Sequence, residues 1–386
     1  MIASTNVALG DRVFLVGLRY KHHARHSGYE SYGRYVATML QPPVDFRWTL
    51  GKWGWPLNQS ITRLTRHPWY SLGAHLTEWG TLLHMARHRN RLYHVLYGDT
   101  DLWLLRRANR LNGNHLVASF HEPAGHLREL RVVDRVCRYL DAVILVSETQ
   151  RAYFEEFVAA ERIFVVPHGV DTEFFRPAQT TGAQPHCITV GSHLRDFATL
   201  KEAMQLVWQV NPRVRFTAVG TRSDEKSMFP PLQDERVQFV DGIGDDELLQ
   251  AYRRASVAVF SFEAATANNA ILEAMATGLP VVATDTGGIG EYVTPECGIL
   301  CPPLDSEAMA AAILCILDAP HLQQSLAAGS RQRALKLDFR HVAVRMAEVY
   351  TSILATNRPA NRLPQPPAPA GLSPKTSRSG GTSVER

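Results

Sequence analysis

Short runs of apolar, often β-branched residues alternate with helical stretches along most of the chain. This alternation is typical of parallel β-sheets whose strands are joined by covering helices. In the first half, strands are predicted at Arg12–Gly17, Leu92–Tyr97, Leu116–Phe120, Ala142–Val146 and Ile163–Val166, and helices at Leu72–Arg87 and Asp101–Leu111. In the second half, strands are predicted at His186–Val190, Arg215–Val219, Val237–Val240, Val257–Phe260, Pro280–Ala283 and Gly298–Leu300, and helices at Ala198–Val210, Asp245–Arg254, Asn269–Thr277 and Ser306–Leu317.

A break between Pro167 and Pro185 separates the two sets of elements. The fold class is therefore predicted as α/β, with two Rossmann-like doubly wound domains facing each other across a cleft. Ligands of such sheets bind at the carboxyl ends of the strands. The predicted parts are a first domain at 1–167, a linker at 168–185, a second domain at 186–338, a helix at 339–356 that can pack back on the first domain, and a Pro- and Ser-rich tail at 357–386 that is expected to be disordered.

The composition is that of a globular protein, because 45% of the residues are apolar and 20% are charged. The chain contains no run of eighteen apolar residues, so the sequence predicts no membrane-spanning helix. Met1–Gly10 lacks the basic start and apolar stretch of a secretory signal. The five cysteines are scattered, and Cys297 and Cys301 lie close together without a further partner at a metal-binding spacing. We interpret them as core residues in a reducing compartment, which predicts a cytoplasmic protein.

The net charge of +4 conceals a difference between the two halves. Residues 1–150 hold 19 Lys and Arg against 11 Asp and Glu, whereas the remainder holds 22 against 26. A basic first half suggests an anionic surface or acceptor, although a solvated face with no partner has the same charge. Cations alternate with aromatic residues around Trp48, Trp53 and Trp55, in a loop that fits sugar stacking, a bilayer interface or an aromatic core. No recognised nucleic-acid module appears, so nucleic acid is not an expected partner.

The segment Phe260–Pro280 carries the most chemical information. It predicts a strand, a loop of small residues, a helix and the beginning of the next strand. Small side chains keep the loop thin, so a diphosphate can approach the backbone amides at the start of the helix. Either Thr266 or Asn268 can cap that helix. The loop residues expected to contact a ligand are Thr266, Ala267, Asn268 and Asn269.

Glu273 lies in the predicted helix as a lone carboxylate among apolar and small neighbours. Such a group either forms a structural ion pair or binds a polar ligand, and a ribose diol is a natural partner. The next strand runs into Gly287-Gly288, which we interpret as a second wall of the same site. In the first half, His121 ends a strand where it can hydrogen-bond a sugar hydroxyl, and Gly28 would permit close approach of a ligand to the backbone.

The order of these segments resembles the retaining nucleotide-sugar glycosyltransferases of family 4, which have the GT-B fold. The matching sequences are Leu-Glu-Ala-Met-Ala at 272–276, Gly-Leu-Pro-Val-Val at 278–282, Thr-Gly-Gly at 286–288 and Val-Pro-His-Gly-Val-Asp at 166–171. The resemblance implies an acceptor-side first domain and a second domain that binds a nucleotide-diphosphate sugar. It also implies retention of configuration at the transferred sugar, without a metal ion or other cofactor.

Two positions differ from the family pattern. Family members have a pair of glutamates with seven residues between them; the first would stand at Ala265, and Glu263 is the candidate substitute. The arginine that usually follows the glycine of the first donor-domain strand is replaced by Ser192, next to Gly191. Arg195 is therefore the cation expected to reach the diphosphate, since its fork of donors suits phosphate oxygens.

The sequence thus predicts transfer of a hexosyl-type unit to a hydroxyl acceptor (a glycan, a glycolipid or a small molecule), with contact to an anionic membrane surface. The predicted catalytic residues are His121, Arg195 and Glu263. Asp99-Thr100-Asp101 has the letters of a metal motif but is interpreted as a turn and helix cap, so no metal site is expected. The alternatives are a catalytically idle nucleotide-sugar-binding protein, which the missing glutamate permits, and a sugar epimerase or phosphorylase of the GT-B fold. A phosphorylase would need a pyridoxal-binding lysine, and none stands out in the second half.

Overall fold

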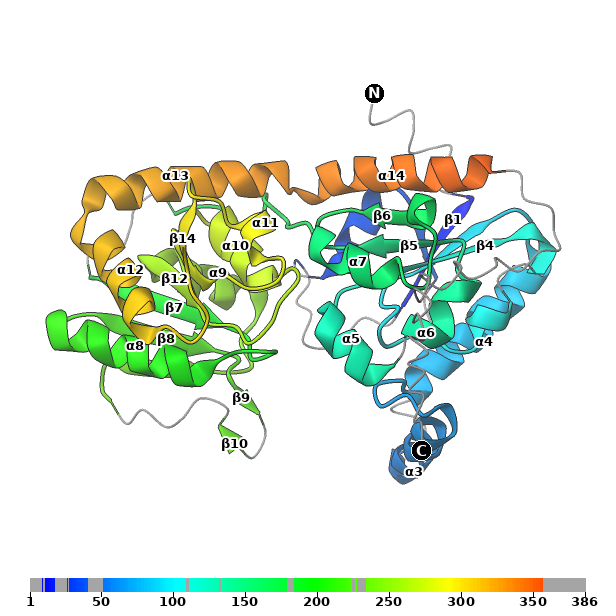
Figure 1. Cartoon of the computed structure of the whole chain (residues 1–386), viewed down its shortest axis with the longest axis horizontal. Helices are drawn as coiled ribbons and strands as arrows, with labels where there is room; N and C mark the ends of the chain where they lie inside the picture. The colour runs from blue at the N-terminus through cyan, green and yellow to red at the C-terminus, as the bar shows by residue number, and fades with distance from the viewer. Residues whose placement is uncertain are drawn as a thin grey trace, which may run out of the picture.

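The computed structural model describes residues 9, 11–17, 26, 28–40, 51–108, 111–131, 133–178, 184–223, 226–227 and 234–356. The predictions for Trp48, for the tail at 357–386 and for the side chains of Trp53 and Trp55 lie outside the described parts. Two six-stranded parallel sheets form two lobes side by side, and one pair of long helices spans both lobes (Figure 1). The predicted α/β class with two doubly wound domains is confirmed.

The first sheet has the strand order β2-β1-β3-β4-β5-β6. Its strands are β1 (Val13–Val16), β2 (Thr38–Leu40), β3 (Leu92–Val95), β4 (His115–Phe120), β5 (Ala142–Leu145) and β6 (Ile163–Val165). The α-helices of this domain are α3 (Gly51–Thr65), α4 (Leu72–Arg87), α5 (Ala124–Leu130), α6 (Val133–Val136) and α7 (Arg151–Phe154). Short 3₁₀ turns are η1 (Tyr29–Tyr35), η2 (Leu105–Arg107), η3 (Leu111–Gly113), η4 (Cys137–Tyr139), η5 (Glu148–Gln150) and η6 (Ala160–Arg162).

The second sheet has the order β11-β8-β7-β12-β13-β14, the arrangement of a dinucleotide-binding sheet. Its strands are β7 (His186–Val190), β8 (Arg215–Val219), β11 (Val237–Val240), β12 (Val257–Phe260), β13 (Val281–Thr284) and β14 (Gly298–Cys301), with a small hairpin of β9 (Arg222–Ser223) and β10 (Lys226–Ser227). Its helices are α8 (Phe197–Val210), α9 (Asp245–Arg254), α10 (Asn269–Ala276), α11 (Ile289–Tyr292) and α12 (Ser306–Asp318), followed by α13 (Pro320–Lys336) and α14 (Phe339–Ala355).

Apolar side chains on both faces explain why these strands are continuous apolar runs. In β12, Val257 and Val259 pack into the core on one face of the sheet, while Ala258 and Phe260 pack into the core on the other. A parallel sheet covered by helices on both sides has this pattern, because neither face meets water. The strands predicted from the sequence are therefore confirmed, most of them within one or two residues.

Two predictions for the first domain are wrong. In the described residues 101–108 of the predicted helix Asp101–Leu111, the structure has only the short turn η2, and Leu111 begins the turn η3. The carboxylate of Glu78, in α4, accepts hydrogen bonds from the amides of Trp103 and Leu104, and so ties this segment to α4. The supposed aromatic loop after residue 50 instead forms the helix α3, which contains Pro56 within its first turns. Gly and Pro in that stretch favour a loop by local preference, and Pro56 lies beyond the first turn, where proline removes a helical hydrogen bond.

Helix α14 comes from the end of the described chain but belongs to the first domain. Its residues Val342, Met346 and Tyr350 are buried in one core with Val13 and Leu15 of β1. Helices α13 and α14 run along the same side of both lobes (Figure 1). In the described part of the chain, no helix is long and apolar enough to cross a bilayer.

The chain crosses between the domains twice, and the two crossings are hydrogen-bonded to each other. The amide of Val170 donates to the carbonyl of Leu337 at 3.0 Å, and the amide of Phe339 donates to the carbonyl of Val170 at 3.1 Å. A β-carbon on Gly169 would lie 2.6 Å from the ring of Phe339, so only glycine permits this approach. The Pro-His-Gly-Val segment therefore forms one side of the connection between the lobes.

A buried polar network links α14 to the first sheet. The hydroxyl of Tyr350 hydrogen-bonds with that of Tyr32 at 2.9 Å and with Nδ1 of His94 at 2.7 Å. Nε2 of His94 continues to the hydroxyl of Ser119 at 2.7 Å, which meets that of Tyr29 at 2.9 Å. Burial, with a smaller effect of the neighbouring His121, lowers the pKa of His94 to about 3, so this imidazole is neutral.

Replacing Tyr350 by phenylalanine should lower the free energy of unfolding by about 0.5–1.5 kcal/mol, because the buried hydrogen bonds of its hydroxyl are lost while the one between Tyr32 and Nδ1 of His94, at 3.0 Å, remains. Urea denaturation measures the loss. Val344→Ala, on the exposed face of the same helix, is the control and should change stability by less than about 0.5 kcal/mol. Equal stability of Tyr350→Phe and the wild type would contradict a stabilising role for the network.

Candidate functional site

The carboxyl ends of the two sheets meet at the boundary between the domains. The hydroxyl of Thr266, after β12, donates to the backbone carbonyl of His121, after β4. Nearby, the carboxylate of Glu291 accepts hydrogen bonds from the hydroxyl of Ser147 at 2.8 Å and from the amide of Glu148 at 3.0 Å. The predicted site residues of both halves are thus brought to one region.

The second sheet reverses its strand order between β7 and β12, the place where ligands of doubly wound sheets bind. The loop after β12 leads into α10, whose N-cap is Asn268; its side-chain oxygen accepts from the amide of Ile271 at 3.3 Å. Thr266 uses its hydroxyl for the contact with His121, so Asn268 is the cap of the two alternatives. Asn269 and Ala267 lie beside it and are partly buried. A helix leaves its first amides without partners within the helix, and they favour an anion.

Arg195, in the loop after β7, is the buried cation of this region. One guanidinium nitrogen, Nη2, donates to the carbonyl of Val190 at 2.7 Å and to Oδ1 of Asn268 at 3.3 Å. Nε and Nη1 have no hydrogen-bond partner among the described residues. The guanidinium carbon lies 4.2 Å from the centre of the Phe262 ring. Burial lowers the pKa of Arg195 to about 9, and no ion pair with a carboxylate among the described residues offsets this effect.

The turn that carries Arg195 depends on Gly191, which adopts a left-handed conformation with φ of 83°. Its amide donates to the carbonyl of Val219 at 2.8 Å, and Ser192 follows, partly buried. A β-carbon on Gly191 would lie 3.4 Å from Nη2 of Arg195, an ordinary contact, so it is the left-handed backbone that favours glycine at this turn.

Glu273 is 4% exposed and lies in α10 at the edge of a small hollow between the domains. The hydroxyl of Tyr252 donates to its Oε2 at 3.0 Å. The hollow is lined by His26, Gly28, Gly169, Val170, Asn269, Glu273 and Phe339, and it is too narrow to hold a water molecule. Glu273 is therefore closed off from solvent on this side in the structure.

Glu263 and Ala265 are two residues apart in sequence, but one is exposed to solvent and the other is buried. Ala265 is buried, and its carbonyl accepts from the amide of Gly288 at 3.0 Å. Glu263 is exposed, its amide donates to the carbonyl of Leu194 at 3.0 Å, and its side chain does not line the hollow beside Glu273. The structure does not bring the candidate substitute to the carboxylate that it was expected to accompany.

Gly287 and Gly288 were predicted to form a second wall of the site. In the structure they lie against the backbone of Ala265 and Thr266, in the loop after β12. A β-carbon on Gly287 would lie 1.9 Å from the carbonyl oxygen of Ala265. One on Gly288 would lie 2.4 Å from the carbonyl of Thr266 and 2.5 Å from the hydroxyl of Ser147 in the other domain. Because glycine has no β-carbon, this turn can pack closely against both the loop after β12 and Ser147 of the first domain.

His121 is held in one orientation and in its neutral form. Its Nε2 donates to the carbonyl of Leu96 at 2.9 Å, and its amide donates to Oδ2 of Asp99 at 2.9 Å. Burial lowers the pKa of the His121 ring to about 4, so Nδ1 is left as an acceptor. The edge of the Tyr29 ring packs on it, with 4.5 Å between centroids. Gly28, at φ of 136°, precedes Tyr29 in a conformation that favours glycine.

The Asp-Thr-Asp motif is part of the turn that supports His121. Burial and the neighbouring Glu122 raise the pKa of Asp99 to about 8. The hydroxyl of Thr100 donates to Oδ1 of Asp101 at 3.0 Å. Asp99 thus uses one oxygen to hold the backbone of His121, as a turn residue does.

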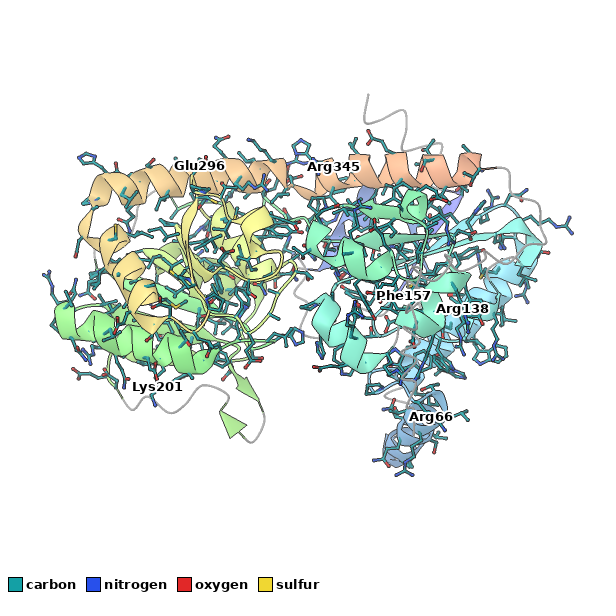
Figure 2. The ribbon with its side chains drawn as sticks, viewed as in Figure 1. Arg66, Arg138, Phe157, Lys201, Glu296 and Arg345 are labelled. Atoms are coloured by element: carbon teal, nitrogen blue, oxygen red, sulfur yellow. The ribbon has the colours of Figure 1, made fainter. Side chains whose placement is uncertain are left out.

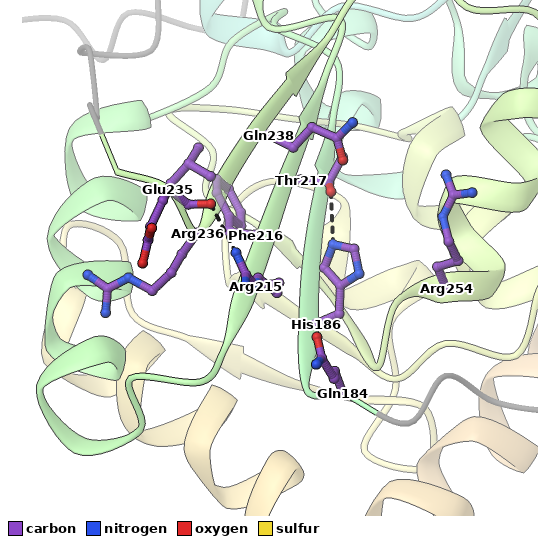
Figure 3. Close-up of a pocket in the computed structure, with 10 residues that line it drawn as sticks. Gln184, His186, Arg215, Phe216, Thr217, Glu235, Arg236, Gln238 and Arg254 are labelled. Atoms are coloured by element: carbon purple, nitrogen blue, oxygen red, sulfur yellow. Dashed lines mark hydrogen bonds between the residues drawn. The ribbon is translucent and has the colours of Figure 1, made fainter.

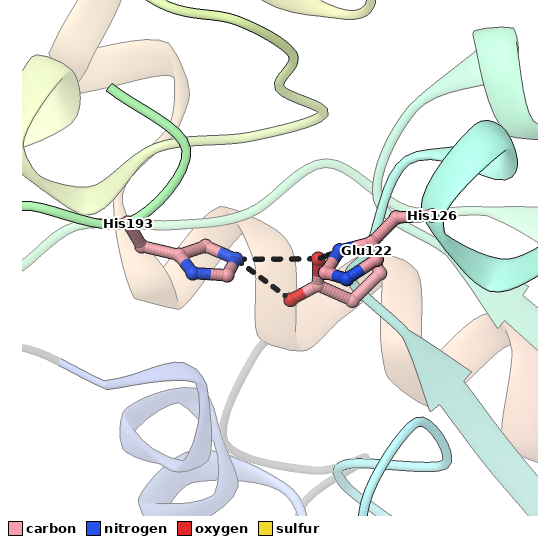
Figure 4. Close-up of side chains that lie close together, drawn as sticks. All are labelled: Glu122, His126 and His193. Atoms are coloured by element: carbon pink, nitrogen blue, oxygen red, sulfur yellow. Dashed lines mark hydrogen bonds and ion pairs between the residues drawn. The ribbon is translucent and has the colours of Figure 1, made fainter. Parts of the chain in front are cut away.

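Sequence reasoning missed a cluster of Glu122, His126 and His193 at the domain boundary (Figure 4). Nε2 of His193 lies 3.0 Å from Oε1 of Glu122, and Nδ1 of His126 lies 2.9 Å from Oε2. Burial would raise the pKa of Glu122, but the hydrogen bonds from His193 and His126 outweigh it and the pKa is lowered. The spacing of Glu122 and His126, four residues apart, was the available signal; His193 is distant in sequence.

A larger hollow, about 570 Å³, lies at the opposite edge of the second sheet (Figure 3). It is lined by the starts of β7, β8 and β11, including His186, whose Nε2 meets the hydroxyl of Thr217 at 2.8 Å. Arg215 donates to the carbonyl of Glu235 at 3.0 Å. Ligands of doubly wound sheets bind at the carboxyl ends of the strands, whereas this hollow lies at their amino ends, so we do not assign the binding site to it.

Comparison with known proteins agrees with this geometry. A family model described as "Glycosyltransferase Family 4" matches residues 7–174, and one described as "Glycosyl transferases group 1" matches residues 184–319. Together the models cover both domains. The chain belongs to the group 1 glycosyltransferases, with the GT-B fold.

The curated proteins that are similar to this chain are named for different activities. Glycogen synthase of Mycobacterium tuberculosis is 32% identical over 43% of this chain, and the match spans only 41% of that protein. The MMP α-(1→4)-mannosyltransferase of Mycolicibacterium hassiacum is 27% identical over 63% of this chain and 66% of that protein. Among solved structures, the Anabaena protein HepE in complex with UDP-glucose has a TM-score of 0.65 at 16% identity, covering 88% of this chain and 100% of that one.

Proposed function

We propose that the protein is a retaining hexosyltransferase that moves a sugar from a nucleotide-diphosphate donor to a hydroxyl acceptor. The observation that carries the proposal is Arg195, a buried guanidinium beside the N-terminus of α10, two of whose nitrogens have no hydrogen-bond partner among the described residues. A diphosphate would supply the missing counter-ion. Glu273, on the same helix, is the group we assign to the ribose hydroxyls, with Tyr252 fixing one of its oxygens.

The proposed chemistry needs charge stabilisation more than a nucleophile. As the bond between sugar and diphosphate breaks, negative charge grows on the leaving group, and Arg195 with the first amides of α10 would stabilise it. In our proposal no metal ion is needed for this step. Nδ1 of His121 would accept a hydrogen bond from a hydroxyl of the transferred sugar. The acceptor hydroxyl attacks the same face that the diphosphate leaves, and a phosphate oxygen takes its proton. Glu263, exposed beside the loop, would contribute only after the domains rearrange.

The experiment that tests the function is a panel of nucleotide sugars incubated with the purified protein. Thermal shift reports binding, and released nucleoside diphosphate reports transfer or hydrolysis. HepE is described in complex with UDP-glucose, so UDP-sugars stand first in the panel beside GDP- and ADP-sugars. Binding without any release would favour the idle sugar-binding protein, and conversion of a sugar into its epimer would favour an epimerase. No shift with any donor would contradict the proposal.

We further propose that the acceptor is met at an anionic membrane surface. Helix α3 protrudes from the first domain, whereas α4 lies along it (Figure 1), and the two helices expose the large apolar side chains Leu57, Leu64, Trp79 and Leu83. Exposed arginines accompany them, including Arg66 at the end of α3 (Figure 2). Apolar groups beside cations suit the interface of a bilayer with anionic lipids. Phosphatidyl-myo-inositol mannosyltransferase of Mycolicibacterium smegmatis, 25% identical over 69% of this chain and 75% of that protein, is named for a lipid acceptor.

The double variant Leu64→Ser, Leu83→Ser should bind anionic vesicles roughly 10-fold or more weakly, since burying one leucine contributes about 1.5–3 kcal/mol. Co-sedimentation at low and high salt measures it, and high salt should weaken wild-type binding by screening the arginines. Val210→Ser, which removes an exposed apolar side chain (66%) from the second domain, is the control and should bind normally. Wild-type protein that sediments with neither anionic nor neutral vesicles would point to a soluble acceptor.

A further inference from the structure

Three side chains with metal-binding atoms meet where the two domains touch. The carboxylate of Glu122, Nδ1 of His126 and Nε2 of His193 lie within 4.8 Å of one another. Figure 4 shows His193 reaching from one side toward Glu122, with His126 on the other side. Bonds from zinc to such atoms measure about 2.0–2.2 Å. Three ligand atoms this close can surround one ion after small side-chain movements.

The first-domain part of the cluster is fixed by the residues around it. Nε2 of Gln150 donates to the carbonyl of Glu122 at 3.0 Å, and Asp99 holds the preceding residue, His121, by its amide. His126 follows in the helix α5, and its ring packs edge-on against Trp69 with 5.0 Å between centroids. Glu122 and His126 therefore present their ligand atoms from a rigid turn and the helix that follows it.

In the second domain, the backbone on either side of the ligand is held, while the ligand side chain lies at the surface. His193 lies between Gly191 and Arg195 in a loop whose backbone pairs with the segment after β12: the amide of Glu263 donates to the carbonyl of Leu194 at 3.0 Å, and Arg195 forms a bridge with Phe262. The His193 side chain itself is 64% exposed, so an ion can enter from solvent. Two imidazoles and one carboxylate favour Zn²⁺ and similar ions over Mg²⁺ or Ca²⁺, and leave a fourth position for water.

We propose that Glu122, His126 and His193 bind one Zn²⁺ ion, which joins the two domains and holds them closed. Two ligands come from the first domain and one from the second, so the ion can keep all three ligands only while the lobes are in contact. None of the three ligands is itself a proposed donor-binding residue, although His193 lies in the same loop as Gly191, Ser192 and Arg195. Metal binding can be measured without transferase activity, so the inference does not depend on that activity.

The first test is metal binding to the full chain. Calorimetry with Zn²⁺ and the visible absorption of bound Co²⁺ should show one site per chain. Loss of an outer-shell partner alone usually weakens metal sites roughly 10–100-fold, so His193→Ala and His126→Ala should each weaken Zn²⁺ binding by about 100-fold. His321→Ala, an exposed histidine on α13, should bind as the wild type does. Wild-type protein without a Co²⁺ spectrum, or a spectrum unchanged in His193→Ala, would overturn the proposal.

The second test distinguishes a joint between the domains from a site on one of them. Small-angle X-ray scattering should show that Zn²⁺ reduces the radius of gyration of the wild type but not of His193→Ala. His193→Cys, which supplies another zinc ligand, should restore the reduction. Compaction by Zn²⁺ in His193→Ala, or tight Zn²⁺ binding by the wild type without any change of size, would overturn the closing role.

Discussion

Replacing Arg195 by leucine is expected to lower kcat/KM for a nucleotide-sugar donor roughly 10²–10³-fold, the usual effect of removing one group that stabilises a leaving anion. The reason is that Nε and Nη1 of this guanidinium are buried without partners among the described residues, beside the cap of α10. A phosphate oxygen of the donor would accept hydrogen bonds from these two nitrogens. Steady-state rates of nucleotide release, measured with the donor that the panel identifies, give the ratio.

The same variant should fold at least as well as the wild type. A buried charge without a counter-ion is costly, and an apolar residue of similar size is often neutral or stabilising in its place. Thermal unfolding without ligand therefore separates a binding role from a structural one. Arg213→Leu, which removes an exposed arginine of the second domain, is the control for the change of charge. A large fall in melting temperature together with the lost activity would show that Arg195 instead stabilises the fold.

Glu273→Gln should weaken donor binding about 10- to 150-fold, since a hydrogen bond to a charged group contributes roughly 1.5–3 kcal/mol. Glutamine keeps the shape and can still accept from the hydroxyl of Tyr252, which now donates to Oε2. Calorimetry with the nucleoside diphosphate and with the full donor measures the affinity. Both ligands should be affected equally, because the proposed contact is to the ribose that they share.

Glu307→Gln, an exposed change on α12, controls for the loss of one negative charge. A folded Glu273→Gln protein with unchanged affinity would remove Glu273 from the site. Affinity lost together with several degrees of melting temperature would assign it to the structure of α10 instead.

The sequence predicted the second domain closely because each of its elements is signalled locally. The run Val257–Phe260 is apolar at every position, small residues follow at 264–267, and Asn268 caps α10. A glycine at φ of 74°, Gly278, ends the helix region before the next strand. Such signals need no knowledge of distant residues.

What the sequence could not predict depends on contacts between distant segments. The position of the glycine pair behind the loop follows from the carbonyl of Ala265 and the hydroxyl of Ser147, the latter in the other domain. His193 and Glu122 are 71 residues apart and meet only because the lobes touch. Helix α3 was missed for a local reason, since Gly51, Gly54 and Pro56 favour a loop by propensity. Tertiary contacts can override such weak local preferences for a loop.

Helix α14 has a consequence for how the protein is made. The ribosome synthesises the first domain before the second, yet the core around Val13 and Leu15 includes Met346 and Tyr350. Domains usually fold as units, the N-terminal one first, while the chain is synthesised at about 5–20 residues per second. Throughout synthesis of the second domain, the first sheet therefore has one apolar face without its cover. A nascent chain stalled before residue 339 should bind chaperones and be cut readily by proteases, and release of the last helix should complete both domains together.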